Sequence, residues 1–145
     1  MQISQNMEPL VSICVPMYNA EKTIEKTLTS IIGQKYKNIE IIIVDNCSSD
    51  ASVNIVQTFN DPRIRLIQSN THLPLGEQNW NRCFPYATGE YMAIFHADDI
   101  YLPDMVSRQI ETFRSFPMVG GVFTQGNIIN ENDEIIGEYR LPPKI

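Results

Sequence analysis

The segment IEIIIVD (Ile39 to Asp45) restricts the possible folds more than any other part of the chain. A near-continuous run of β-branched apolar residues is typical of a strand that is covered on both faces of a sheet. The run is far shorter than the roughly 20 apolar residues that a membrane-spanning helix needs. We therefore expect a buried, mostly parallel sheet, and no membrane span in this chain.

Strand-like and helix-like segments alternate around this run. Further strands are predicted at Leu10 to Met17, Arg63 to Ser69 and Tyr91 to Ala97. Helices are predicted between these strands. The first ends at Gly33, and the second starts at a Ser49 or Asp50 cap. The third runs through about Tyr86, and the fourth starts at Pro103. This order predicts an α/β fold with helices on both faces of the sheet.

Two segments near the C-terminus, GGVFTQGNII and IIGEYRL, flank the turn NEND and predict an antiparallel strand pair. The length of 145 residues suits one ordinary domain. We therefore expect residues 1–145 to form a single domain.

Charge and cysteine usage exclude several classes of protein. The formal net charge of −6 argues against a nonspecific nucleic-acid binder. The three cysteines form no C-x-x-C pair, so neither a structural zinc site nor a disulfide framework is indicated. The polar N-terminus has no apolar signal core. These features predict reduced thiols and a cytoplasmic location.

Polar side chains gather at the predicted carboxyl ends of the strands. They are Tyr18 and Asn19, Asp45 and Asn46, Asn70, and the pair Asp98 and Asp99. In open parallel sheets, ligands bind outside these strand ends. The sequence therefore predicts a binding site along one edge of the sheet.

Three familiar kinds of phosphate site do not match. The turn after the first strand contains no glycine, so the G-x-G-x-x-G dinucleotide fingerprint is absent. No G-x-x-x-x-G-K-[ST] loop occurs in the sequence. The phosphoacceptor domains of two-component signalling place their acid pair after the first strand, whereas here the pair follows the fourth.

The adjacent acids Asp98 and Asp99 have two readings. Aspartates often form turns or cap helices, but the next helix is expected near Pro103, with Asp104 already in its first turn. The other reading is that a divalent cation, Mn²⁺ or Mg²⁺, neutralises the pair and holds a diphosphate beside it. We favour the cation, because like charges side by side otherwise cost stability.

Two long stretches resemble one known family. VSICVPMYNAEKTIEKTLTSIIGQKYKNIEIIIVDNCSSD is similar to the opening of the family 2 glycosyltransferases, which have the GT-A fold. ATGEYMAIFHADDIYLPDM is similar to the segment that carries their aspartate-rich metal motif. The resemblance covers about Val11 to Phe123. It implies inverting transfer of a sugar from a nucleotide-diphosphate donor, expected to be a UDP-sugar, to an acceptor hydroxyl.

The resemblance also implies roles for individual residues. Tyr18 would stack on the nucleobase, Asp45 and Asn46 would lie near base and ribose, and Asp99 would ligate the metal. Asp98 would contact the ribose or the metal. The implied nucleotide-binding set is Pro16, Tyr18, Asn19, Asp45, Asn46, Asn81, Arg82 and Asp98, and the implied metal ligands are Asp98 and Asp99.

Structural alternatives stand beside these roles. Tyr18 can simply cover the top of the sheet, and Asp45 can simply satisfy its turn. Asn46 departs from the second aspartate of many members, which puts the base preference in doubt. In NWNRC, Asn81 or Arg82 can reach the donor, or the segment can be a helix with Trp80 and Phe84 packed. We expect His96 to be packed or hydrogen-bonded rather than a metal ligand.

The general base that inversion needs is not found in the sequence. Glu131, Asp133 and Glu134 lie in or beside a turn and do not match the family's base. We therefore expect the chain to be a truncated donor-binding part, with the base beyond Ile145. The resemblance implies a glycan or lipid-linked acceptor, with the inner face of a membrane as the place where the chain and this acceptor would meet. The alternative is a non-catalytic sugar-nucleotide-binding or assembly module.

Overall fold

The structure is a computed structural model that describes residues 8–140. The chain divides into two compact units, Met1–Val106 and Ser107–Ile145, which are described separately. The assignment of residues 1–145 to one domain remains a prediction.

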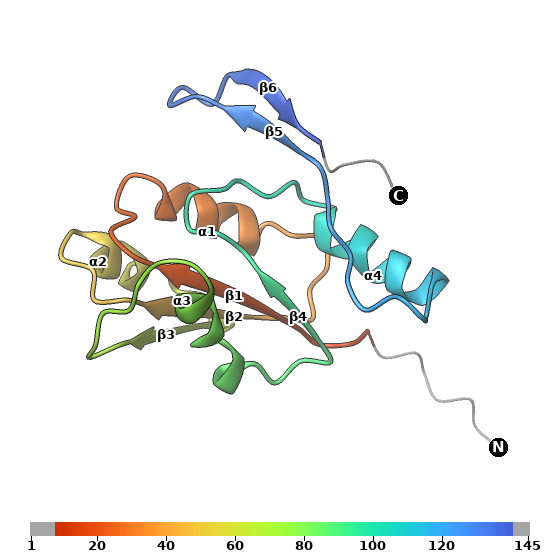
Figure 1. Cartoon of the computed structure of the whole chain (residues 1–145), viewed down its shortest axis with the longest axis horizontal. Coiled ribbons are helices and arrows are strands. Elements are labelled where there is room, and N and C mark those ends of the chain that lie inside the picture. Colours follow the sequence, from red (N-terminus) through yellow and green to blue (C-terminus); the bar gives the residue numbers. More distant parts are fainter. Residues whose placement is uncertain (1–7, 141–145) are drawn as a thin grey trace. The chain divides into compact units, whose positions relative to one another are not determined.

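The first unit is built on a four-stranded parallel sheet with strand order β3-β2-β1-β4 (Figure 1). The strands are β1 (Val11–Met17), β2 (Ile39–Asp45), β3 (Ile64–Gln68) and β4 (Tyr91–Ile94). The central strands β1 and β2 pair from Val11–Ile39 to Met17–Asp45, and nearly all of their residues are buried. The prediction from IEIIIVD is therefore confirmed.

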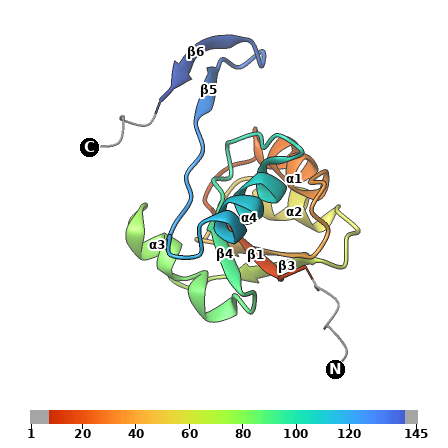
Figure 2. The same ribbon diagram turned by 90° about the vertical axis from the view of Figure 1, so that its right-hand side faces the viewer.

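Helices cover both faces of this sheet, as predicted. Figures 1 and 2 show α1 (Ile24–Ile32) and α2 (Ser52–Gln57) on one side and α3 (Glu77–Asn81) on the other. α1 buries Ile24, Leu28 and Ile31, the apolar positions that its sequence spacing predicts. On the α3 side, Cys14, Ile42, Val44 and Cys83 form a buried apolar cluster.

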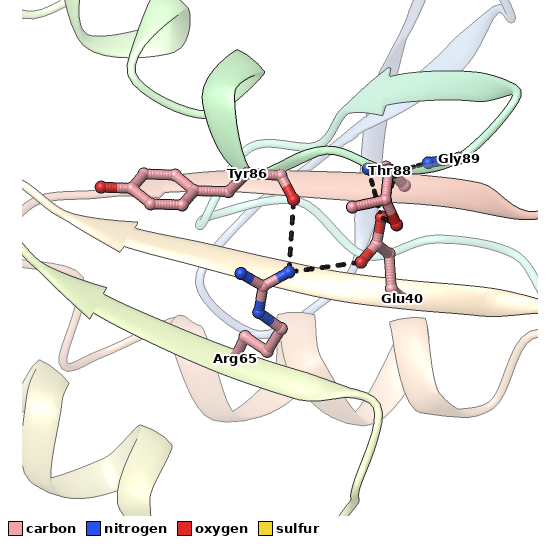
Figure 3. Close-up of polar contacts among 6 residues, drawn as sticks. Glu40, Arg65, Tyr86, Thr88 and Gly89 are labelled. Carbon is pink, nitrogen blue, oxygen red and sulfur yellow. Dashed lines mark hydrogen bonds and ion pairs between the residues drawn. The ribbon is translucent and has the colours of Figure 1, made fainter.

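A polar cluster holds the chain ahead of β4 against this second face (Figure 3). The Glu40 carboxylate accepts hydrogen bonds from the Ser12 hydroxyl at 2.5 Å and the Thr88 amide at 2.7 Å. Arg65 lies 3.5 Å from Glu40 and donates to the backbone oxygen of Tyr86. Three neighbouring strands thereby fix the link between α3 and β4.

Several element boundaries differ from the sequence-based ones. The helix expected through Tyr86 is broken into α3 and a 3₁₀ turn, η1 (Phe84–Tyr86), because Pro85 lacks the amide that a continuous helix needs. β4 ends at Ile94 rather than Ala97. The N-cap of α2 is Ala51 rather than the predicted Ser49 or Asp50, although the Asp50 side chain accepts the Ser52 backbone amide at 3.0 Å just ahead of the helix.

The second unit contains the remainder of α4 (Met105–Ser115) and the strands β5 (Gly126–Ile129) and β6 (Ile135–Tyr139). The two strands pair antiparallel, as the sequence predicts. Asp133 has a left-handed backbone, with φ of 62°, in the turn between them. Ile128 and Ile135 are exposed on this pair.

None of the helices within residues 8–140 is both long enough and apolar enough to cross a bilayer.

Candidate functional site

A pocket of about 710 Å³ lies at the carboxyl end of β1, within the first unit. Its wall is formed by the loop after β1, the start of α3 and the segment after β4. Four of the residues implicated by sequence line it: Pro16, Tyr18, Asn19 and Asp98. Three of them, Tyr18, Asn19 and Asp98, belong to the polar set that was expected to converge at this edge of the sheet.

Tyr18 is exposed, and its ring lies against that of His72, with 4.6 Å between the ring centroids. An accessible aromatic face at a strand end is a suitable platform for a nucleobase. His72 was not among the residues singled out by sequence. It lies in an irregular loop, for which periodicity gives no signal.

Asn19 connects the loops that follow β1 and β2. Its side-chain oxygen accepts a hydrogen bond from the Ser49 backbone amide at 2.9 Å. Its backbone amide donates to the Ser48 hydroxyl at 2.9 Å. Its backbone is left-handed, with φ of 46°, which asparagine tolerates better than most residues. In this structure Asn19 shapes the pocket wall through these contacts.

Asp45 and Asn46 are buried behind the pocket rather than in its lining. Asp45 accepts the Ser48 amide at 3.1 Å, as the turn reading predicts. The Asn46 amide donates to the backbone oxygen of Leu73 and its side-chain oxygen accepts the Leu73 amide, both at 2.8 Å. Asn46 therefore holds the loop that carries His72, instead of presenting a free amide edge.

Arg82 joins the same arrangement. Its guanidinium donates to the Asn46 side chain at 3.0 Å and to the backbone oxygen of Thr71. It also lines a second, smaller pocket of about 400 Å³ beside β3. Asn81, exposed at the end of α3, lines neither of these two pockets.

The acid pair lies at the pocket mouth, with Asp98 in the lining and Asp99 next to it. Two threonines fix the backbone next to the pair: the hydroxyls of Thr23, the N-cap of α1, and of Thr27 donate to the backbone oxygen of Ala97 at 2.9 and 3.0 Å. Partial burial raises the pKa of Asp99, and the neighbouring Asp98 charge raises that pKa further, against smaller opposing effects of His96 and Tyr101. The pair is therefore a place of uncompensated negative charge.

Among the residues that the structure describes, no three His, Cys, Asp or Glu side chains converge on one point. Two carboxylates alone leave most positions of an octahedral cation open. That donor set fits a Mg²⁺ or Mn²⁺ ion whose remaining ligands are diphosphate oxygens and water. It does not fit an ion held by protein groups alone.

His96 and Trp80 form part of the pocket wall that the sequence did not predict. His96 is exposed, and its ring meets that of Trp80 edge-on at 5.5 Å. The sequence predicts a packed or hydrogen-bonded His96; its ring does contact Trp80, but the residue is exposed in the pocket wall, past the end of β4 at Ile94. Trp80 and Phe84, the proposed packed pair, are 38% and 46% exposed.

Comparison with known proteins identifies the chain's relatives. The family model described as "Glycosyl transferase family 2" matches residues 12–141. WfgD of Escherichia coli, a UDP-Glc:alpha-D-GlcNAc-diphosphoundecaprenol beta-1,3-glucosyltransferase, is 36% identical over 94% of this chain and 53% of its own length. The putative glycosyltransferase EpsE of Bacillus subtilis is 35% identical over 79% of this chain and 43% of its own length.

Solved structures of GT-A glycosyltransferases share the fold. TarS of S. aureus in complex with UDP-GlcNAc has a TM-score of 0.68 and 26% identity, over 72% of this chain and 31% of TarS. The mannosyltransferase PcManGT from Pyrobaculum calidifontis, in complex with GDP-Man and Mn²⁺, has a TM-score of 0.69 and 25% identity, over 88% of this chain and 38% of its own. The chain thus spans about half or less of the length of these proteins.

Proposed function

The chain belongs to glycosyl transferase family 2, and on that premise we propose that it is the donor-binding part of an inverting, metal-dependent glycosyltransferase. The observation that carries the proposal is the 710 Å³ pocket lined by both Tyr18 and Asp98. In such a pocket the aromatic ring suits the base of a nucleotide diphosphate. The carboxylate suits the diphosphate, provided that a cation neutralises the negative charges of both.

We propose a UDP-sugar as the donor. The name of WfgD specifies UDP-Glc, and TarS is seen with UDP-GlcNAc, whereas PcManGT is seen with GDP-Man. Tyr18 would stack on the base. The remaining nucleotide-binding residues would be Pro16, Asn19, Asp45, Asn46, Asn81, Arg82 and Asp98. Of these, Asn46 and Arg82 would act by holding the loop at residues 71–73 beside the base.

Asp98 and Asp99 would hold the Mn²⁺ or Mg²⁺ ion, as the Mn²⁺ in the PcManGT complex suggests for a relative. When bound, the cation would neutralise the diphosphate and stabilise the charge that develops on the leaving group. The chain's own contribution is to fix the acid pair. Thr23 and Thr27 bind the backbone oxygens of Ala97 and Asp99. The backbone that carries the two carboxylates is therefore in place before the donor arrives.

The acceptor would be a glycan or a lipid-linked sugar. The name of WfgD describes an acceptor of the second kind, a sugar diphosphoundecaprenol. Such an acceptor suggests polysaccharide assembly at the cytoplasmic face of a membrane. Inverting transfer needs a general base that deprotonates the acceptor hydroxyl, and we assign that role to no residue of this chain, which spans 53% of the length of WfgD.

The alternative of a non-catalytic binding module is not favoured, because relatives over most of this chain are described as glycosyltransferases. Both readings predict donor binding, so they differ in turnover only. The discriminating observation is hydrolysis or transfer of the sugar by the protein, which a binding module would not carry out.

The direct test is calorimetric titration of the chain with UDP, with and without Mn²⁺, and with GDP as comparator. We expect Mn²⁺-dependent binding that is tighter for UDP. Binding that is equal with and without the cation would contradict the metal assignment. Tighter binding of GDP would contradict the assigned base while leaving the site intact.

A further inference from the structure

Asn79 is a buried side chain with an unused hydrogen-bonding atom. It is 3% exposed, lies on α3 and lines the 710 Å³ pocket. Its side-chain oxygen is buried and has no hydrogen-bond donor among the residues that the structure describes. A buried acceptor without a partner costs stability. Its persistence in a pocket wall points to a partner that arrives with the ligand.

The chemistry of this atom restricts the partner. An amide oxygen only accepts hydrogen bonds, so phosphate and carbonyl oxygens cannot satisfy it. A hydroxyl group can. The last torsion of an asparagine side chain is broad, and the oxygen leaves no hydrogen bond behind when it turns, so it can swing toward the pocket at little cost.

Trp80 places an aromatic surface beside this acceptor. It is 38% exposed and lines the same pocket, with its ring edge-on to His96. The backbone amides of Asn79 and Trp80 both donate to the backbone oxygen of Gly76 at 3.0 Å, so one helical turn fixes the backbone of both residues. An apolar ring next to a hydroxyl acceptor is the combination that a sugar ring, apolar on its faces and hydroxylated at its edge, would fill.

Gly76 sets the position of this turn. Its φ of 98° lies in the left-handed region, and α3 begins directly after it. Asp98, where the diphosphate is proposed to lie, lines the same pocket. A sugar attached to that diphosphate would therefore share a pocket with Asn79 and Trp80.

We propose that the Asn79 side-chain oxygen accepts a hydrogen bond from a ring hydroxyl of the transferred sugar, with Trp80 as the apolar surface beneath the ring. This inference rests on the proposed function and assigns the part of the pocket that recognises the sugar. The ribose also carries hydroxyls, so the test must separate these two sources.

The test compares Asn79→Leu with the unmodified chain by calorimetry in Mn²⁺, using UDP-glucose and UDP as ligands. Leucine has nearly the same shape and no acceptor. We expect affinity for UDP-glucose to fall about tenfold, the value of one good hydrogen bond, and affinity for UDP to stay the same. Gln78→Leu, on the exposed side of the same helix, is the matched control and should change neither.

Each other outcome has a defined meaning. An equal loss for both ligands would place the donor on the ribose or the base and overturn the assignment to the sugar. No loss for either would overturn the proposal and leave a buried water as the partner of Asn79. Absence of UDP binding to the unmodified chain would instead contradict the proposed function, because that measurement does not involve Asn79.

Two further measurements separate recognition of the sugar by Asn79 from a purely structural role: the melting temperature of the variant, and the binding of modified ligands to the unmodified chain. Removing an unsatisfied acceptor should leave the melting temperature of the unliganded chain unchanged or higher, whereas a structural role predicts a lower one. If Asn79→Leu does not fold, the monodeoxy analogues of UDP-glucose test the unmodified chain. One of them should bind about tenfold more weakly than UDP-glucose, and equal binding by all would overturn the proposal.

Discussion

The hydroxyl of Thr27, on α1, donates a hydrogen bond to the backbone oxygen of Asp99 at 2.9 Å, across 72 positions of sequence. Ser30 on α1 and Gln34, just beyond its C-terminal end, hold the chain that follows. Ser30 accepts the Tyr101 amide at 3.1 Å, and Gln34 accepts the Val106 amide at 3.2 Å. A polar row along one helix thus determines where the acid pair lies.

Thr27→Val tests this dependence. Valine preserves the shape but removes the donor to the backbone oxygen of Asp99, whereas Ala97 keeps the hydrogen bond from Thr23, so we expect a loss of about 1–3 kcal/mol in unfolding free energy. Denaturant unfolding measures it. Mn²⁺-dependent UDP binding should weaken as well. Thr29→Val is the matched control, because its exposed hydroxyl only donates to Glu25 within α1. Equal effects of the two variants would contradict the special role of Thr27.

Asp99→Asn separates the metal role from a turn role. Burial and the Asp98 charge raise the pKa of Asp99 above the ordinary 3.8, so the folded state holds this proton more tightly than the unfolded state. Stability therefore falls as pH rises through the interval between the two pKa values, and the full penalty remains at neutral pH. We expect the variant to be at least as stable as the unmodified chain at pH 7, and to lose Mn²⁺-dependent UDP binding.

The measurements are thermal unfolding between pH 3 and 7 and calorimetry with Mn²⁺ and UDP. Glu90→Gln, an exposed carboxylate ahead of β4, serves as the control and should keep cation-dependent binding. A destabilised Asp99→Asn chain that still binds UDP in a cation-dependent manner would establish the turn reading instead.

Glu40→Gln should show the opposite pH dependence. Burial opposes ionisation of Glu40, but hydrogen bonds from Ser12 and Thr88 together outweigh it, with a contribution from Arg65, and its pKa is lowered from the ordinary 4.5. A lowered pKa stabilises the folded state at pH values above 4.5, and this stabilisation is lost as pH falls through the folded-state pKa. We expect Glu40→Gln to cost about 1–2 kcal/mol at pH 7, mainly from hydrogen bonds to a charged acceptor.

Denaturant unfolding of both chains at pH 7 and near pH 3 checks this expectation, and the difference between them should shrink at the lower pH. A difference that is constant with pH would show that the carboxylate charge contributes nothing. Glu111→Gln, on an exposed face of α4, is the control with the same change of charge.

The sheet could be predicted from the sequence because its central strands are nearly all apolar. β1 and β2 are buried along their length, so a continuous apolar run bounded by turn residues predicts each strand and its approximate ends. The end of β4 could not be predicted. Phe95 is apolar and buried, but it lies beyond the last residue of β4 and packs on Tyr101, with 3.8 Å between the ring centroids. Apolar character alone does not distinguish these two situations.

The site was predictable where residue type and strand end coincide, as for Tyr18, Asn19 and Asp98. It was not predictable in the loop at residues 69–76 or on α3, because the contacts of His72 and Asn79 depend on tertiary packing. One signal was available: Thr23, Thr27, Ser30 and Gln34 follow one another at helical spacing. Such a polar row beside the apolar face of an amphipathic helix indicates buried backbone that needs partners.

Gly89→Ala tests why a glycine stands in the segment ATGEY. A Cβ atom at this position would lie 2.6 Å from the backbone oxygen of Leu10 and 2.8 Å from the backbone nitrogen of Ser12. Both are backbone atoms and cannot move aside, and the Gly89 amide also donates to the Ser12 hydroxyl at 2.8 Å. The methyl group must therefore push the start of β4 away from β1. We expect a loss of about 1–3 kcal/mol in unfolding free energy.

The control is Gly120→Ala, where an added Cβ meets no atom within 4 Å. Alanine there should be neutral or slightly stabilising, since it restricts the unfolded chain. Because β4 leads directly to Asp98, the displaced strand in Gly89→Ala should also weaken Mn²⁺-dependent UDP binding. Comparable unfolding free energies for the two variants would mean that β4 can shift freely, and that the acid pair is positioned by α1 alone.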